Sequence, residues 1–162
     1  MPYEGSYLWE LRRRVGSRLL LMPGAQVLVI DASDRILFQR SQDSGLWELP
    51  AGAAEPGDDF RTTAARELFE ETGLLVDARE LVPFASLSRA DIHTLTYPNG
   101  DILHCFALCF EARHWTGTLR PAADEVTDLG FFKQPPGGLH PPTRVVLGLY
   151  DAYRSTGLFQ AS

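Results

Sequence analysis

The stretch from Gly52 to Leu74, GAAEPGDDFRTTAARELFEETGL, constrains the fold of this chain more than any other segment. Its first part is rich in glycine and proline, which favour turns over regular structure. Asp58 and Asp59 follow, and either side chain can accept the free backbone N–H groups at the start of a helix. From there to Thr72 the residues favour helix, and Gly73 stands where a helix end favours a left-handed residue. We therefore expect a turn followed by a helix that ends at Gly73.

Three carboxylates of this helix, Glu67, Glu70 and Glu71, fall on one side at about 100° per residue. Apolar residues such as Leu68 occupy the neighbouring side, so the acidic stripe borders the buried face. Repulsion between Glu67 and Glu71, and the helix dipole, disfavour this arrangement by roughly a few tenths of a kcal/mol each. A divalent cation would stabilise it, because hard cations bind clustered carboxylate oxygens. A metal site and a solvated acidic face are both open on spacing alone.

The same spacing resembles the Nudix box, Gly-x5-Glu-x7-Arg-Glu-U-x-Glu-Glu-x-Gly-U, where U is aliphatic. The match begins at Gly52, includes Arg66 and the three glutamates, and ends at Leu74. One position departs from the pattern, because Asp58 stands where the first Glu is expected. The chain is therefore similar to bacterial Nudix hydrolases of the ADP-ribose pyrophosphatase-like kind. The proline that marks true ADP-ribose enzymes is not evident at its place, where Arg89 stands.

The resemblance implies a metal centre that binds Mg²⁺ or Mn²⁺. It implies Glu70 and Glu71 as ligands, joined by the backbone carbonyl of Ala51 just before the box glycine. A further acidic ligand from outside the box is common in the family, and Glu125 is the best candidate in this chain. Asp124 is the substitute if the register shifts, and a solvated loop acid is the alternative.

The reaction that the resemblance implies is hydrolysis of a diphosphate bond in a nucleoside diphosphate derivative by activated water. The substrate would be a nucleotide, an ADP-ribose-like molecule or a nucleotide sugar. Glu67 would bridge metals or accept the proton of the water, although the base differs among members, and Glu70 would support catalysis as a ligand. Arg66 would orient a carboxylate through charge-assisted hydrogen bonds. The alternative is a Nudix fold that binds nucleotides as a silent sensor.

Four residues are candidate substrate contacts. Arg40 ends a predicted strand beside the glycine loop and could meet a phosphate, or could simply be a surface residue. Trp47 could stack on a base, although packing against the loop is the more frequent role of a buried tryptophan. Asp58 is one methylene shorter than the Glu of the pattern, so its contact could be lost or rerouted through water. Tyr97 lies beside an Asn-Gly hairpin turn that could overhang the site.

Cys105 and Cys109 lie in one predicted strand, about 13 Å apart, which is too far for a disulfide between them. They face the same side, so we expect buried thiols, as in a reducing compartment. His104 faces the other side, which excludes a shared zinc ion. An isoprenoid diphosphate isomerase with a cysteine acid is a third alternative, which requires that this face line the pocket.

The order of predicted elements indicates one α/β domain over residues 1–162, with an N-terminal helical extension over 1–22. Thr143 is expected to cap the last helix, which would end near Gly157. The arrangement predicts a Nudix-type α/β/α sandwich, with a mixed β-sheet between helices. The predicted strands are 25–31, 35–40, 81–87, 92–97, 102–112 and 127–132, with an N-terminal helix over 7–15.

Charge and hydropathy limit the partners of the chain. Its net charge of −6 argues against a nucleic-acid polymer as partner, but allows a small phosphate substrate beside metal ions. The arginines 12–14 are expected on the solvent side of the N-terminal helix. No apolar run is long enough for a membrane span or signal peptide, so no membrane partner is expected and cytoplasm is the default. Homodimer formation stays open.

Overall fold

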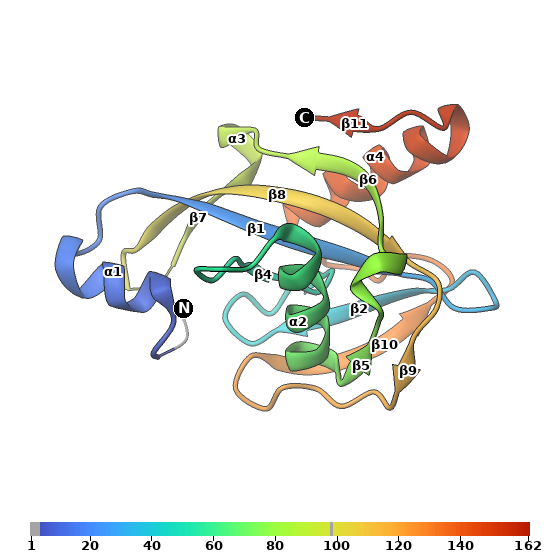
Figure 1. Ribbon diagram of the computed structural model, residues 1–162, viewed down its shortest axis with the longest axis horizontal. Helices are drawn as coiled ribbons and strands as arrows, with labels where there is room; N and C mark the ends of the chain where they lie inside the picture. Colours follow the sequence, from blue (N-terminus) through green and yellow to red (C-terminus); the bar gives the residue numbers. More distant parts are fainter. Residues whose placement is uncertain (1–3, 98) are drawn as a thin grey trace.

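The computed structural model describes residues 4–97 and 99–162. A six-stranded mixed sheet lies at its centre, with α2 against one face and α4 against the other (Figure 1). This arrangement confirms the predicted mixed sheet between helices. The helices are α1 (Tyr7–Val15), α2 (Phe60–Thr72), α3 (Ala90–His93) and α4 (Pro141–Thr156), with a 3-10 turn η1 (Ala78–Glu80). The strands are β1 (Leu20–Val29), β2 (Ile36–Ser41), β3 (Trp47–Glu48), β4 (Ala51–Ala53), β5 (Leu74–Leu75), β6 (Val82–Leu87), β7 (Thr94–Thr96), β8 (Ile102–Ala112), β9 (Thr116–Gly117), β10 (Val126–Phe132) and β11 (Gln160–Ala161).

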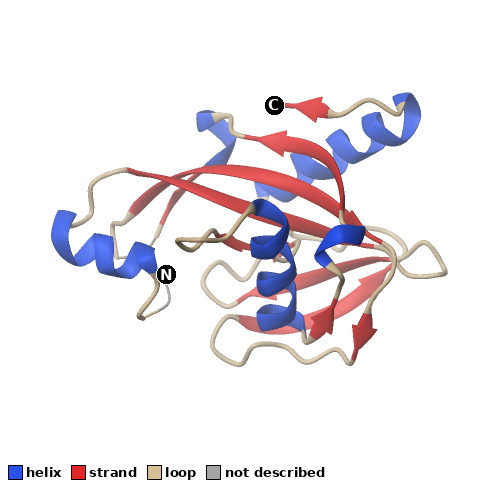
Figure 2. Ribbon diagram, viewed as in Figure 1, coloured by secondary structure: helices blue, strands red, loops and turns tan. Residues whose placement is uncertain are grey.

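The strands form two main sheets (Figure 2). The central sheet has the order β11-β6-β8-β1-β4, with β7 also paired to β8, and its longest pair is the parallel pair β1 and β8. The second sheet is β10-β2-β3 and is antiparallel. The turn over 31–34 brings β2 back antiparallel to the end of β1, through the bridge Ile30–Ile36 and the Asp31 N–H to Arg35 carbonyl hydrogen bond, but the two strands then continue in different sheets. β4, which leads into α2, is the edge strand beside β1.

Two hydrophobic clusters cover the two faces of the central sheet. Val27 of β1 and Leu68 of α2 belong to the cluster on one face, and both are buried. Leu28 of β1 and Val146 of α4 belong to the cluster on the other face and are also buried. Successive residues of a strand point to opposite faces, so β1 contributes to both clusters. The sheet thereby fixes α2, with its acidic stripe, against a buried core.

Helix α1 ends where the sequence predicted, because Gly16 adopts φ 69 at its C-cap. The helical extension predicted for residues 1–22 is too long, since β1 already begins at Leu20. Arg12 is buried, contrary to the expectation that it faces solvent. Its guanidinium donates hydrogen bonds to the carbonyls of Gly16, Arg18 and Ile102, so it joins α1 to the start of β8.

Two further boundaries differ from the prediction. The strand predicted over 92–97 begins instead with the short helix α3 and becomes β7 at Thr94. The last helix begins at Pro141 with His140 as N-cap, so Thr143 is not its cap. Proline suits this first turn, because its φ is preset and its missing N–H would have no partner there. Pro98 of the predicted hairpin turn lies outside the described residues.

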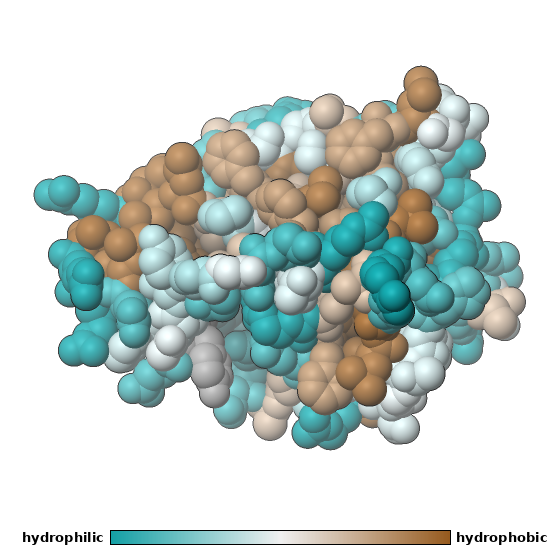
Figure 3. Space-filling view, in the orientation of Figure 1, coloured by the Kyte–Doolittle hydropathy of each residue, from teal (hydrophilic) through white to brown (hydrophobic). Residues whose placement is uncertain are grey.

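Cys105 and Cys109 are buried, free thiols, as predicted. Within the described ranges, no helix is both long and apolar enough to cross a membrane. Figure 3 shows hydrophilic residues over part of α2, and apolar residues at its lower end and over the sheet beside it. Phe60 and Phe69 of α2 are both exposed. Leu21 of β1 and Phe106 of β8 are among the exposed apolar residues.

Candidate active site

Helix α2 begins and ends as its sequence predicts. The side chain of Asp59 accepts a hydrogen bond from the Thr62 N–H at 2.8 Å, which satisfies a free donor of the first turn. Gly73 closes the helix in the left-handed conformation at φ 76. These two caps fix the register in which the three glutamates leave the helix.

The acidic stripe runs from the core to the solvent. Glu71 is buried, and the Glu67 side chain is only 14% exposed. The Glu70 side chain is 55% exposed. A purely solvated acidic face is therefore excluded for Glu71 and Glu67, because both carboxylates lose most of their water.

The turn before α2 lies directly on these carboxylates. A Cβ atom at Gly52 would overlap the carboxyl group of Glu67, so only glycine leaves that group its place. The next residue back, Ala51, donates its N–H to Glu71 Oε2 at 2.9 Å. The glycine of the turn and the backbone of β4 thus position two of the three glutamates.

Arg66 holds the acidic residues of the box together. Its guanidinium donates to Glu67 Oε1 at 2.8 Å, to Glu70 Oε2 at 3.1 Å and to Asp58 Oδ2 at 3.2 Å. It also donates to the Ala53 carbonyl at 2.8 Å. Asp58, although shorter than the glutamate of the pattern, therefore reaches the arginine directly.

Burial changes the acidity of this group. The pKa of Glu67 is raised to about 7, chiefly by desolvation and also by the charges of Glu70 and Glu125, against the opposing effect of Arg66. Desolvation also raises the pKa of Glu71 well above its usual range. Without a cation nearby, Glu71 therefore favours the protonated form near neutral pH, and Glu67 exchanges its proton there.

A buried polar pair that the sequence analysis did not identify lies behind Glu71. Gln39 of β2 pairs with Glu48 of β3 across the strands, and Gln39 is 1% exposed. Burial raises the pKa of Glu48 to about 7, and hydrogen bonding with Gln39 partly offsets this for Glu48 and for Glu71. His140 Nδ1 lies 3.8 Å from Glu48 Oε2. The sequence feature that could have indicated this pair is a glutamine, Gln39, within the otherwise apolar first part of the strand Ile36–Ser41.

Glu125 lies in the loop before β10, at the position predicted for it. Its backbone carbonyl accepts a hydrogen bond from the Gln42 N–H at 2.8 Å. Desolvation raises its pKa, and the charge of Glu70 adds to the rise, so the two carboxylates lie within electrostatic reach of each other. The loop thus faces the acidic stripe of α2 from the other sheet.

The other candidate substrate contacts have neighbours of their own. Arg40 is exposed and donates from Nε to the Gly45 carbonyl at 2.9 Å. Trp47 packs edge-on against Phe132, with ring centroids 5.0 Å apart. Tyr97 packs with the cluster around Cys105 under α1, and burial raises its pKa. The structure therefore brings none of these three into a hydrogen bond with the glutamates.

The donor set fits a hard divalent cation in kind. Carboxylates and a loop carbonyl are oxygen ligands, which Mg²⁺ and Mn²⁺ favour. Among the described residues, no three acidic, His or Cys side chains converge closely enough to hold an ion as they stand. The reason lies in Arg66, which holds Glu67 and Glu70 through its own hydrogen bonds. Glu70 is exposed enough to exchange this bond for another partner.

A family model described as the NUDIX domain matches residues 20–136, a range that includes the turn and the capped helix with its acidic stripe. The chain belongs to the Nudix family. The matched range includes β1, the box and the Glu125 loop, and begins after α1. The resemblance predicted from the box is thereby confirmed.

Several Nudix relatives are similar to parts of the chain. A MutT-like protein of Streptomyces ambofaciens is 43% identical over 78 residues, which cover 46% of this chain and 51% of that protein. The NAD-capped RNA hydrolase NudC of Actinobacillus succinogenes is 33% identical over 111 residues, which cover 67% of this chain and 37% of that protein. The chain thus spans about half or less of the length of these relatives.

A solved structure shows the same fold. The crystal structure of a MutT NUDIX hydrolase from Burkholderia pseudomallei matches with a TM-score of 0.66 and 22% identity. The match covers 80% of this chain and 98% of that one. This likeness confirms the Nudix-type architecture.

Proposed function

We propose that the chain hydrolyses a phosphoanhydride bond in a nucleoside diphosphate derivative, with the help of Mg²⁺ or Mn²⁺. The observation that carries this proposal is the acidic stripe of α2, which is desolvated at Glu67 and Glu71 and in contact with the Gly52 turn. Buried like charges are unfavourable unless a cation or a proton compensates them. Membership of the Nudix family supports the cation.

The residues that would hold the cation are Glu70 and Glu71, with the Ala51 carbonyl, Glu67 and Glu125. A divalent cation, when bound, neutralises phosphate charge and makes a neighbouring water more acidic. The Ala51 N–H fixes the orientation of Glu71 through its hydrogen bond. The Glu70 side chain, which is the most exposed of the three, is the ligand that would have to leave Arg66.

Glu67 is the proposed group that accepts a proton from the attacking water. Without a cation its pKa is about 7, and a bound divalent cation would favour the ionised carboxylate that a general base requires. Arg66 orients its carboxylate, and Asp58 holds Arg66 from the other side. Gly52 keeps the space in which the carboxylate lies. These residues act together as an oriented base beside the ligands.

The proposed substrate is a small molecule with a nucleoside diphosphate part. Arg40 and Trp47 lie on β2 and β3, which lead to the Gly52 turn, and are the proposed contacts to phosphate and base. Trp47 would contact the base while its ring packs edge-on against Phe132. Tyr97, which is half-buried under α1, is proposed to contact the more distant part of the substrate.

The proposal is tested with phosphate-release assays on nucleoside diphosphate sugars, dinucleoside diphosphates and nucleoside triphosphates, with Mg²⁺, with Mn²⁺ and with a chelator. Glu70→Gln and Glu71→Gln should each lower kcat by about 100-fold or more, because each removes a charged ligand. Glu80→Gln, which changes an exposed acid of η1, is the matched control and should leave kcat unchanged.

Equal turnover in the two variants and the parent would contradict the proposal. Saturable nucleotide binding without hydrolysis under any of these metals would instead establish the silent sensor.

A further inference from the structure

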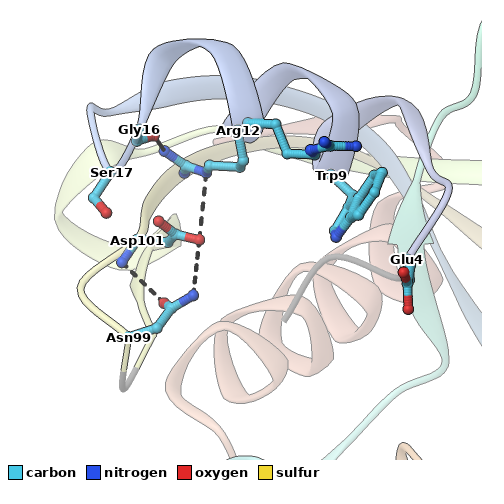
Figure 4. A pocket seen from close by; sticks show the side chains of 8 residues that line it. Glu4, Trp9, Arg12, Gly16, Ser17, Asn99 and Asp101 are labelled. Carbon is cyan, nitrogen blue, oxygen red and sulfur yellow. Dashed lines mark hydrogen bonds and ion pairs between the residues drawn. The ribbon is translucent and has the colours of Figure 1, made fainter.

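A cleft lies beneath α1, away from the acidic stripe of α2. It has a volume of about 440 Å³ and opens between α1 and the turn that joins β7 to β8 (Figure 4). Volumes of this size are typical of small-molecule sites. Its polar and aromatic lining consists of Trp9, Arg12, Arg13, Ser17, Asn99 and Asp101, with the carboxylate of Glu4 at the Trp9 end (Figure 4).

One wall of this α1 cleft is rigid and polar. Arg12 is 8% exposed, and its guanidinium is held by three backbone carbonyls. Its Nε lies 3.6 Å from Asp101 Oδ2 and makes no hydrogen bond within the described residues. Asn99 and Asp101 bind each other through two hydrogen bonds, of 3.0 and 3.1 Å. This wall therefore presents a fixed carboxylate and a fixed amide.

The opposite wall is aromatic and cationic. The half-buried Trp9 ring carries the guanidinium of Arg13 at 4.8 Å from its centroid. Arg13 is exposed and forms no ion pair with a described carboxylate. A tryptophan together with an arginine that stacks on it, and that has no carboxylate partner among the described residues, suits a ligand that combines a flat ring with negative charge. Aromatic side chains stack on bases of every kind, because each base has a π-face.

We propose that the α1 cleft binds a nucleoside monophosphate group. The base would stack beside Trp9, and the phosphate would bind Arg13, which lies at the same end of the cleft. Asp101 and Asn99 would accept and donate hydrogen bonds to the ribose hydroxyls or to the base edge. A purely apolar ligand is disfavoured, because it would cover the charged and polar groups of Arg13, Asn99 and Asp101 without replacing their water.

The α1 cleft adjoins the box loop through its own helix. The Tyr7 N–H donates to the Glu55 carboxylate at 3.0 Å, and Leu8 packs in one cluster with Tyr97 and Ala53. The nucleoside monophosphate could thus be the far half of a substrate held at α2, or a free nucleotide. The chemistry that recognises it is the same in both cases, and kinetics distinguish them.

The binding test uses the full chain and calorimetric titration with AMP, GMP, CMP and UMP, in EDTA so that the proposed metal site does not contribute. At least one nucleotide should bind saturably, and Trp9→Leu and Arg13→Ala should each weaken its binding by tenfold or more. Arg14→Ala is the matched control, because Arg14 is an exposed neighbour on α1 that does not line the cleft. Circular dichroism of each variant separates loss of binding from loss of folding.

The proposal is overturned if none of the four nucleotides binds, or if Arg13→Ala binds as tightly as the parent while folded. This result is independent of hydrolysis, so it can fail while the proposed function holds. Kinetics then distinguish the two sources of the ligand, the far half of a substrate and a free nucleotide. This step rests on the proposed function, because it requires a substrate that the chain hydrolyses. If Trp9→Leu raises KM for a dinucleoside diphosphate only, the far half of the substrate occupies the cleft. If KM is unchanged for all substrates, a free nucleotide does.

Discussion

At the scale of single residues, Gly52 determines where the Glu67 carboxylate lies. The carboxyl group fills the volume that any larger residue at position 52 would need. Arg66 then orients the same group from the helix side. The position of the proposed base thus depends on a residue with no side chain.

Gly52→Ala is expected to lower turnover by about 10- to 100-fold, because the flexible Glu67 side chain must leave its place. The free energy of unfolding should change little, since the displaced atoms are the far end of that side chain. Gly148→Ala in α4 is the control: its new Cβ meets no atom within 4 Å, and stability should rise by about 0.5–1 kcal/mol. Unchanged turnover in Gly52→Ala would contradict the positioning role.

The metal-free protein should lose stability as pH rises from 5 to 8. The folded-state pKa of Glu67 is about 7, above its unfolded value near 4.5, so the folded state binds more protons between these values. Stability therefore falls with rising pH in this window, by on the order of 2 kcal/mol from this group. Thermal unfolding in EDTA at several pH values measures the change.

Glu67→Gln provides the comparison for this pH dependence, because it removes the titrating group. The buried His93 acts in the opposite direction, since burial lowers its pKa, and the difference between parent and variant cancels that effect. If the difference in the free energy of unfolding between parent and variant does not vary between pH 5 and 8, the pKa of Glu67 is not raised by folding.

At the scale of elements, α1 depends on one buried arginine. Arg12 bonds three carbonyls from the end of α1, the loop after it and the start of β8. The helix is also tied at its start, where the Tyr7 N–H donates to Glu55. The two ends of α1 are therefore joined to the sheet and to the box loop.

Arg12→Ala should lower the free energy of unfolding by about 2–4 kcal/mol, because it leaves buried carbonyls without a donor and Asp101 without its cationic neighbour. Hydrogen exchange of the α1 amides should accelerate more than exchange in α2. Arg14→Ala, in which an exposed arginine is removed from the same helix, should change stability by less than about 0.5 kcal/mol. Equal effects of the two substitutions would mean that Arg12 does not anchor the helix.

At the scale of the whole molecule, β1 and β8 separate two cores. Leu68 of α2 belongs to the cluster on one face of the sheet, and Val146 of α4 belongs to the cluster on the other face. Both side chains are fully buried. The central strands keep the two clusters from sharing side-chain contacts.

Leu68→Ala should cost about 2–5 kcal/mol and Val146→Ala somewhat less, because each leaves a cavity. The effects should add within about 0.5 kcal/mol in the double variant, since the sheet lies between the two sites. Urea unfolding of the four proteins measures this. The pair Leu68→Ala with Val27→Ala, within one cluster, is the control and should deviate from additivity. Coupling above about 1 kcal/mol between the two faces would contradict independent cores.

The sequence by itself determined α2, its caps at Asp59 and Gly73, and the side on which its glutamates lie. These features follow from interactions between residues a few positions apart, which a sequence displays directly. It also determined β8 and the end of α1 at Gly16.

Only the tertiary structure decided that Arg12 is buried, that β1 and β2 belong to different sheets, and that Gln39 and Glu48 lie behind Glu71. The first turn of α4 and the helix before β7 also differ from their local pattern. The physical reason is that burial and strand pairing depend on residues far apart in the chain. A solvent-facing arginine and one that binds carbonyls up to 90 positions away have the same local sequence pattern.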